Sequence, residues 1–393
     1  MLSLEKSYFI LYTIVMKKPI KIVSISLLSI IAAAILIVGG YLLYVVFQYY
    51  RIVDNIELEV VSPVQTEIRA GEDYTVVSYN LGFGAYSPEY SFFMDEGVMN
   101  DGTNVVGKYA KGMNKADVEK NIIGQMTVAK EQAADFYFFQ EVDVDADRSY
   151  HINMYARARN ELSDYSSVYA ENFHTAKLLY PFNDPIGKTA SAGILTLSKY
   201  KIDKAVRRSF PLSKSLLDKL FDLDRCFSVQ RLPISGSDKQ LVMINLHMSA
   251  YDEGGTVRAK QLEMLNAVLA EERAAGNYVI AGGDFNHCLI ADQFDSDEAA
   301  QNHFPSGQVT PDWVKSSVLH NAELAEGFRI VADSGVSTCR GADIPYTPGV
   351  NYTTVIDGFV VSDNVTVNFE HTVDTQYAYS DHNPVILSFS LNG

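Results

Sequence analysis

Cysteine is scarce in this chain of 393 residues. It occurs only at Cys226, Cys288 and Cys339, and these positions form neither a CxxC pair nor a zinc-type spacing. The pattern excludes a thiolate metal site and a disulfide framework, since at most one pair could bridge. Cysteine usage therefore does not identify the redox compartment.

Basic residues are also few, with 32 lysines and arginines against 48 aspartates and glutamates and a formal net charge of -16. This balance opposes a tight, sequence-independent grip on nucleic acid, which needs clustered cations against phosphates. It argues less against an enzyme, because a bound divalent cation needs carboxylates and reverses the local field.

Repeats and low-complexity segments are missing. The hydrophobic share of 47% and the charged share of 20% are typical of a globular protein with a core. The length suits one large α/β unit with an additional N-terminal segment.

The N-terminal segment is almost wholly apolar from Ile20 to Phe47, apart from Lys21, small polar residues and tyrosines. It is long enough to cross a bilayer as a helix. A cleaved signal peptide and a buried core helix are the alternatives. We favour an uncleaved anchor, because the bulky stretch Tyr41 to Tyr50 stands where a cleavage motif should lie.

The charges around this segment indicate its orientation. Lys17, Lys18 and Lys21 lie at its start, whereas mainly acidic residues follow it. The positive-inside rule then places the N-terminus in the cytoplasm. We expect a single-pass protein of the cell membrane with a large extracytoplasmic domain, divided into a cytoplasmic N-terminus (1–19), a transmembrane anchor (20–48), a stalk (49–70) and the large domain (71–393).

The remaining chain alternates short apolar runs with amphipathic stretches. The runs predict strands buried on both faces, and the stretches 118–134 and 256–273 predict helices. We expect an α/β fold, a four-layer α/β/β/α sandwich of two packed mixed sheets, preceded by the transmembrane helix. The expected strands are 75–79, 136–139, 194–197, 241–245, 278–281, 355–361 and 385–389.

Polar side chains lie on or directly after these strands, where α/β folds place their ligands. Each one alone has a structural explanation as a turn former, a helix cap or a satisfied histidine. Together they supply metal-binding carboxylates, amides and two histidines, a combination suited to catalysis. They are Asn80, Gln140, Glu141, His247, Asp284, Asn286, Asp357, Asp381 and His382.

In this order the set resembles the endonuclease/exonuclease/phosphatase superfamily, which includes deoxyribonuclease I, apurinic endonucleases, bacterial neutral sphingomyelinases and inositol-polyphosphate phosphatases. The resemblance covers about residue 72 onward, and its most specific segments are GGDFN and SDHNPV. The matching segments read VVSYNLGFG, FYFFQEVD, SAGILTLSKYKI, LVMINLHMS, VIAGGDFNH, TTVIDGFVVSD and YSDHNPVILS.

The resemblance implies a magnesium-dependent phosphoesterase, with Mn²⁺ as a substitute metal. Glu141 would ligate the ion, helped by Asn80 and Asp381, because Mg²⁺ prefers hard oxygen ligands. His382 would be the general base for the attacking water, and Asp357 would fix its tautomer.

The remaining residues would handle the water and the phosphate. Asp284 would help to orient the water, and Asn286 would hold a phosphate oxygen. His247 would face the phosphate from the opposite side, stabilising charge or protonating the leaving oxygen. Arg225 is either a phosphate contact, as in some relatives, or an ordinary surface ion pair.

The substrate stays open, because loops set it and the fold does not. The segments 86–111 and 293–314 either form a specificity wall or pack over the sheets. Nucleic acid, a phospholipid headgroup and a small phosphoester are the candidate substrates, a phosphodiester being preferred, and no obligatory protein partner is evident. The alternative is a non-catalytic membrane-anchored module that uses the fold to bind phosphate or a partner.

Overall fold

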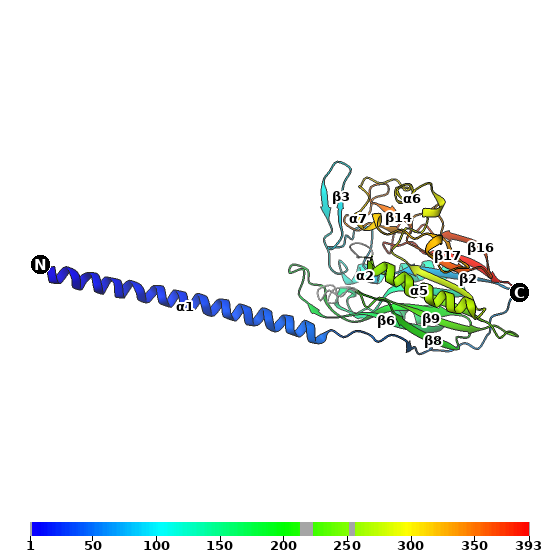
Figure 1. The fold of residues 1–393 in the computed structure, drawn as a ribbon, viewed down its shortest axis with the longest axis horizontal. Coiled ribbons are helices and arrows are strands. Elements are labelled where there is room, and N and C mark those ends of the chain that lie inside the picture. Colours follow the sequence, from blue (N-terminus) through cyan, green and yellow to red (C-terminus); the bar gives the residue numbers. More distant parts are fainter. Residues whose placement is uncertain (1, 213–222, 251–255, 393) are drawn as a thin grey trace. The chain divides into compact units, whose positions relative to one another are not determined.

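The structure, a computed structural model, describes residues 2–212, 223–250 and 256–392. The chain forms two compact units, residues 1–50 and 51–393. The first consists of one long helix, α1 (Leu2–Gln48) (Figure 1). Its part from Lys21 to Gln48 is mostly exposed, and it is long and apolar enough to cross a membrane.

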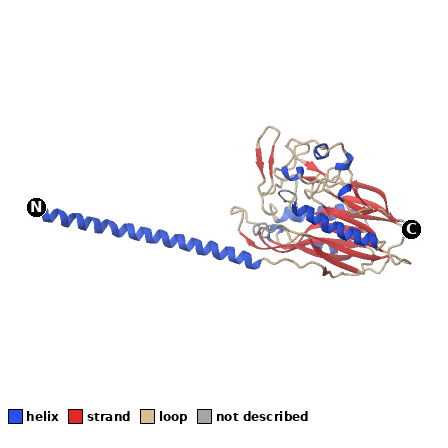
Figure 2. Cartoon of the chain, in the orientation of Figure 1, coloured by secondary structure: helices blue, strands red, loops and turns tan. Residues whose placement is uncertain are grey.

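The second unit is built on packed β-sheets (Figure 2). The described residues form two large mixed sheets, with seven strands in sheet A and six in sheet B. Each sheet contains one parallel pair, β10 with β11 in sheet A and β2 with β5 in sheet B. In spatial order, sheet A is β1 (Ile56–Glu57), β8 (Lys204–Ser209), β9 (Cys226–Pro233), β10 (Gln240–His247), β11 (Tyr278–Asp284), β15 (Asp357–Ser362) and β12 (Phe328–Val331). Sheet B is β16 (Val365–Thr372), β17 (Val385–Leu391), β2 (Asp73–Asn80), β5 (Phe136–Ala146), β7 (Gly187–Ser198) and β6 (Ser166–Leu178).

The other elements are shorter, apart from two long helices. Two small hairpins, β3 (Glu96–Val98) with β4 (Asn104–Val106) and β13 (Cys339–Arg340) with β14 (Thr353–Thr354), stand apart from the sheets. Among the described residues of this unit, the helices are α2 (Lys115–Glu131), α3 (Met154–Glu161), α5 (Thr256–Ala274), α6 (Asp297–Gln301) and α7 (Asp312–Lys315). Single 3₁₀ turns are η1 (Gly82–Gly84), η2 (Asp147–Ser149), η3 (Ala291–Gln293) and η4 (Asn321–Glu323).

Three hydrophobic clusters define four layers. Phe136, Phe138 and Met243 belong to the cluster between the two sheets. A second cluster joins the outer face of sheet B to α2 and α3, and a third joins the outer face of sheet A to α5. The predicted α/β/β/α sandwich is therefore confirmed, because strands that are apolar on both faces must be covered on both faces.

The segment 49–70, expected to be a stalk, packs on the domain instead. β1 pairs with β8, Val61 bridges to Ser167, and the fully buried Ile68 bridges to Ile234. Leu58, Val60 and Ile68 supply apolar side chains to the cluster between the two sheets. The stalk prediction was wrong for this segment, which belongs to the folded unit.

Candidate active site

Three neighbouring strands of sheet A place functional side chains in one row. The parallel pairing of β10 with β11 sets His247 opposite Asp284, and the antiparallel pairing of β11 with β15 sets Asp284 opposite Asp357. All three residues are buried. Since adjacent strands lie about 4.8 Å apart, the backbone ladder itself fixes their spacing.

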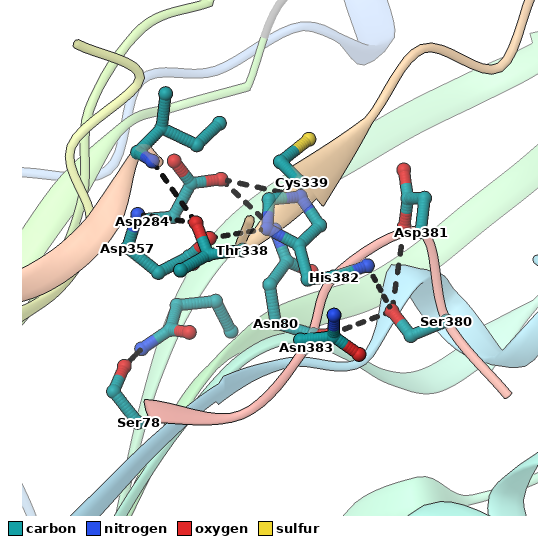
Figure 3. Close-up of polar contacts among 12 residues, drawn as sticks. Ser78, Asn80, Asp284, Thr338, Cys339, Asp357, Ser380, Asp381, His382 and Asn383 are labelled. Carbon is teal, nitrogen blue, oxygen red and sulfur yellow. Dashed lines mark hydrogen bonds and ion pairs between the residues drawn. The ribbon is translucent and has the colours of Figure 1, made fainter. Parts of the chain in front are cut away.

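His382 lies against this row, on the segment that leads into β17 (Figure 3). Its Nδ1 is 2.7 Å from Asp357 Oδ2, and its Nε2 is 3.8 Å from Asp284 Oδ2. Asp357 is itself held by its backbone, because its N–H donates to Thr338 Oγ1 at 3.0 Å. The pair thus forms an oriented imidazole whose Nε2 faces a second carboxylate.

Sheet B contributes Asn80, the last residue of β2, to the same site. Its Nδ2 donates to Asp284 Oδ2 at 3.0 Å, and its Oδ1 accepts from the Gly82 N–H at 3.0 Å. Ser380 Oγ donates to the Asn80 carbonyl oxygen at 2.7 Å and accepts from the His382 N–H at 3.2 Å. The ends of both sheets therefore meet at one site.

Glu141 and Asp381 form the acidic side of the site. Burial raises the pKa of Glu141, and the charge of Asp381 raises it further. Burial likewise raises the pKa of Asp381. Glu141 has a left-handed backbone, with φ of 53°, a strained conformation for a side chain of this kind. Two half-buried carboxylates that repel each other are a suitable environment for a cation.

The two histidines of the site differ in protonation. Burial lowers the pKa of His247 well below its usual value, and the charges of Arg225 and His382 lower it further, although Asp284 Oδ2 lies 3.4 Å from its Nε2. Burial alone would lower the pKa of His382 too, but the charge and hydrogen bond of Asp357, together with Cys339 and Asp381, hold this pKa well above the usual value. His247 is therefore neutral where His382 is the basic group.

Asn286 and Arg225, the remaining predicted residues, also lie near the other site residues. Asn286 has its backbone N–H bonded to Asp284 Oδ1 at 2.9 Å and its Nδ2 bonded to the Met248 carbonyl oxygen at 2.9 Å. Arg225 is buried, and its charge lowers the pKa of both Glu141 and His247. A surface ion pair is thus the wrong interpretation of Arg225.

Arg148 is a residue that the sequence argument missed. Its guanidinium donates to both carboxylate oxygens of the fully buried Asp143, at 3.0 and 2.8 Å, and lies 4.1 Å from the ring centroid of Phe83 and 4.9 Å from that of Phe173. Its charge opposes the rise in the pKa of Glu141. The available signal was a single arginine in the acidic run DVDADRS.

The polar pair Gln140 and Asn245 was also missed as a unit. Gln140 Nε2 donates to Asn245 Oδ1 at 2.8 Å, and both side chains are fully buried. The first lies on β5 of sheet B and the second on β10 of sheet A. The bond joins the two sheets close to the strand ends that carry Glu141 and His247.

The two long segments 86–111 and 293–314 contact each other. Met99 bridges to Gln308, and the Asn100 N–H donates to the Gly307 carbonyl oxygen at 2.9 Å. Part of segment 86–111 also packs as a buried aromatic cluster with Phe83, Tyr86 and Tyr90. The two segments are therefore joined to each other and do not act as independent loops.

Comparisons with known proteins agree with this architecture. The sequence model of the endonuclease/exonuclease/phosphatase family matches residues 77–382. A structure of an endonuclease/exonuclease/phosphatase from Beutenbergia cavernae DSM 12333 is 17% identical, with a TM-score of 0.51, over 83% of this chain and 72% of that one.

Two further structures are similar at a lower level. The endonuclease/exonuclease/phosphatase from Bacteroides vulgatus is 14% identical, with a TM-score of 0.48, over 82% of this chain and 100% of that chain. TDP2 from Caenorhabditis elegans is 15% identical, with a TM-score of 0.49, over 82% and 77% of the two chains. No curated protein matches this chain. From the extent of the family match, the chain belongs to the endonuclease/exonuclease/phosphatase family.

Proposed function

We propose that this family member is a divalent-metal-dependent phosphodiesterase, with Mg²⁺ as its metal and His382 as the general base. The observation that carries the proposal is the pair His382 and Asp357, in which Nε2 of the oriented imidazole faces Asp284. The acidic pair Glu141 and Asp381 lies in the same site. An enzyme that hydrolyses phosphate esters needs both a base for water and a group that neutralises the phosphate.

The donor set fits a hard cation. Glu141 and Asp381 offer carboxylate oxygens, and Asn80 offers an amide oxygen, the ligand types that Mg²⁺ takes. Burial raises the pKa of both carboxylates although nearby positive charges oppose the rise, so a bound cation would favour their ionised forms. When bound, the ion would neutralise a phosphate oxygen and polarise the phosphorus centre.

His382 would take the proton of the attacking water at Nε2. Its Nδ1 donates to Asp357, so Nε2 is the free acceptor. A water within hydrogen-bond reach of both His382 Nε2 and Asp284 Oδ2, which are 3.8 Å apart, would be held by two acceptors. This orientation directs the oxygen lone pair of the water away from the two acceptors and toward a phosphate.

His247 and Asn286 would contact the phosphate as neutral donors. The low pKa of His247 argues for charge stabilisation by an N–H and against proton donation from an imidazolium. One N–H of the Asn286 amide bonds to the Met248 carbonyl oxygen, and we assign the other to a phosphate oxygen. Arg225 would add a fixed positive charge on the same side.

Hydrolysis of bis-p-nitrophenyl phosphate and of the monoester, with Mg²⁺ and with a chelator, tests this proposal. We expect the diester to be the better substrate, the chelator to abolish turnover, and His382→Ala to lower kcat by about 10²- to 10⁴-fold. His371→Ala is the matched control, because His371 is an exposed histidine on β16. Folded wild type that turns over neither ester would favour a binding module.

We also propose that residues 20–48 span the cell membrane, with residues 1–19 in the cytoplasm and the catalytic unit outside. The support is the apolar, exposed stretch Lys21–Gln48 and the lysines at its start. On intact cells, a single cysteine introduced in the exposed turn at Gly236 should react with an impermeant maleimide, whereas a single cysteine at position 5 should not. Labelling of position 5 alone would reverse the orientation.

A further inference from the structure

The turn between β6 and β7 exposes an unusual amount of apolar surface. Phe182 is 89% exposed, Tyr180 54% and Leu179 45%. Three such side chains at one hairpin tip form an apolar patch in contact with water, which is unfavourable unless something covers it. We call Leu179, Tyr180 and Phe182 the β6–β7 tip.

The β6–β7 tip is held in place by segment 86–111. The ring of Tyr180 packs against Phe93, with centroids 5.8 Å apart. Asp184, in the same turn, accepts from the Ala110 N–H at 3.0 Å and pairs with Lys111 at 3.2 Å. The exposed rings are therefore presented by an anchored turn.

The register of sheet B places this tip at the same end as the site. β5 runs past Glu141 to Ala146, which pairs with Thr189 near the start of β7. Leu178 pairs with Gly187, so the turn 179–186 lies beyond the end of β5. The tip thus extends from the sheet end that carries Asn80 and Glu141.

The chain joins the catalytic unit at this end as well. The Ile52 N–H donates to Asp224 Oδ2 at 2.8 Å, and Arg51 donates to the Phe210 carbonyl oxygen at 2.5 Å. Phe210 and Asp224 lie next to Ser209 and Cys226, which pair where β8 ends and β9 begins. The following residue of β9, Phe227, pairs with Leu246, the neighbour of His247. We call the contacts of Arg51 and Ile52 with Phe210 and Asp224 the attachment point.

The tip and this attachment point also share an edge of the unit. Arg207 Nε of β8 donates to the Glu171 carbonyl oxygen of β6 at 2.8 Å, so the β8 edge of sheet A lies against the β6 edge of sheet B. Two separate observations, an apolar tip and the point where the chain enters the unit, therefore concern the same end and the same edge.

Very little chain separates α1 from the attachment point. α1 ends at Gln48, and the hydrogen bonds of the catalytic unit begin at Arg51 and Ile52. The connection from Gln48 to Ile52 spans at most about 14 Å when fully extended. If α1 crosses a bilayer, the attachment point must stay close to the lipid surface.

We propose that the β6–β7 tip docks into the interfacial layer of the membrane that α1 spans. Tyrosine and phenylalanine side chains favour this layer, because it accepts both their apolar rings and the tyrosine hydroxyl. The site end of both sheets then faces the lipid headgroups. The docking rests on the proposed spanning role of α1. Preference for phosphate esters at the membrane surface would rest in addition on the proposed hydrolase.

Lipid quenching tests the docking without any assay of activity. The chain has one tryptophan, Trp313, so Phe182→Trp in a Trp313→Phe background gives a single reporter. The full chain is placed in vesicles of phosphatidylcholine and phosphatidylglycerol, with bromine on the phosphatidylcholine acyl chains. We expect the reporter at position 182 to be quenched several-fold more than in vesicles without bromine.

Phe369→Trp in the same background is the matched control. Phe369 is 47% exposed on β16, at the opposite edge of sheet B, and its reporter should not respond to bromine. Equal quenching at the two positions overturns the proposal. So does a reporter at 182 that is shielded from acrylamide but insensitive to bromine, which would mean a protein partner or a second copy. Tyr180→Trp repeats the measurement at a second position.

Activity separates this inference from the proposed function. Phe182→Asp should slow hydrolysis of a vesicle-borne diester several-fold and leave hydrolysis of bis-p-nitrophenyl phosphate unchanged. If bromine does not quench the reporter at position 182 while the protein hydrolyses both the vesicle-borne diester and bis-p-nitrophenyl phosphate, the docking alone is contradicted. Bromine quenching in a protein that hydrolyses neither ester would contradict the phosphodiesterase alone.

Discussion

At the scale of single residues, one carboxylate faces two imidazoles in different charge states. Asp284 Oδ2 lies 3.4 Å from His247 Nε2 and 3.8 Å from His382 Nε2. Only His382 has a second carboxylate, Asp357, at hydrogen-bond distance. This contact separates the two pKa values, and such separation is how neighbouring groups acquire different roles in catalysis.

Asp357→Asn should therefore shift the pH dependence of kcat. A general base acts when deprotonated, so the rate rises as the pH passes its pKa, which Asp357 raises in His382 against the opposing effect of burial. Removing that negative charge should move the ascending limb to lower pH and reduce the plateau by up to about 10²- to 10⁴-fold, because the tautomer of the general base is no longer fixed. A pH profile of diester hydrolysis measures both effects, and an unmoved limb would contradict the assignment of His382.

Arg148→Met should destabilise the protein strongly. It leaves the carboxylate of Asp143, which is fully buried, without its bidentate partner. Breaking a buried pair in this way costs about 3–5 kcal/mol. Urea unfolding measures the loss. Arg159→Met is the control, because Arg159 also lies over a ring, that of Tyr155, but on the exposed face of α3, and a similar loss there would argue against burial as the cause.

At the scale of elements, the site depends on how closely β10 and β11 approach. Gly283 has φ of 147°, and a Cβ there would overlap the backbone carbonyl of Leu246. Gly283→Ala should push the two strands apart, displace Asp284 and cost about 3 kcal/mol of stability. The midpoint temperature of thermal unfolding and kcat should both fall. Gly335→Ala, whose Cβ would meet only the Asp333 side chain at 3.2 Å, should leave both nearly unchanged.

The elements also show what the sequence could predict. The apolar run 241–245 lies inside β10, and the polar residues at the strand ends do converge. β8, with the sequence KAVRRS, and β6 were missed, because alternating charged residues conceal a half-buried strand. Contacts between sheets, such as Gln140 with Asn245, depend on which strands face each other and leave no local pattern.

At the scale of the whole molecule, three groups of the site make the stability of the folded protein depend on pH. Burial raises the pKa of Asp284 to about 7 and raises that of Glu141, and Asp357 holds the pKa of His382 high against burial. In each case the folded protein binds a proton more tightly than the unfolded chain does. By linkage, the metal-free protein should lose stability as the pH rises from about 4 through about 7 and beyond.

Mg²⁺ should reverse this trend. Metal that binds only the folded state adds about 2.7 kcal/mol at a concentration near 100 times its Kd, and the gain should grow with pH because protons and metal compete for the same carboxylates. Calorimetry at several pH values, with and without Mg²⁺, measures the shift in Tm. Glu141→Gln should abolish most of it, and an unchanged shift in that variant would place the metal elsewhere.

The hydrogen bond from Ser380 to the carbonyl of Asn80 joins residues 300 positions apart. β17, which follows the SDHNPV segment, pairs with β2 at the centre of sheet B. During synthesis, the centre of this sheet must wait for β17, since such distant pairing forms only after both partners exist. With the membrane topology proposed above, a nascent chain would thus lack hydrolytic capacity until nearly all of it has emerged.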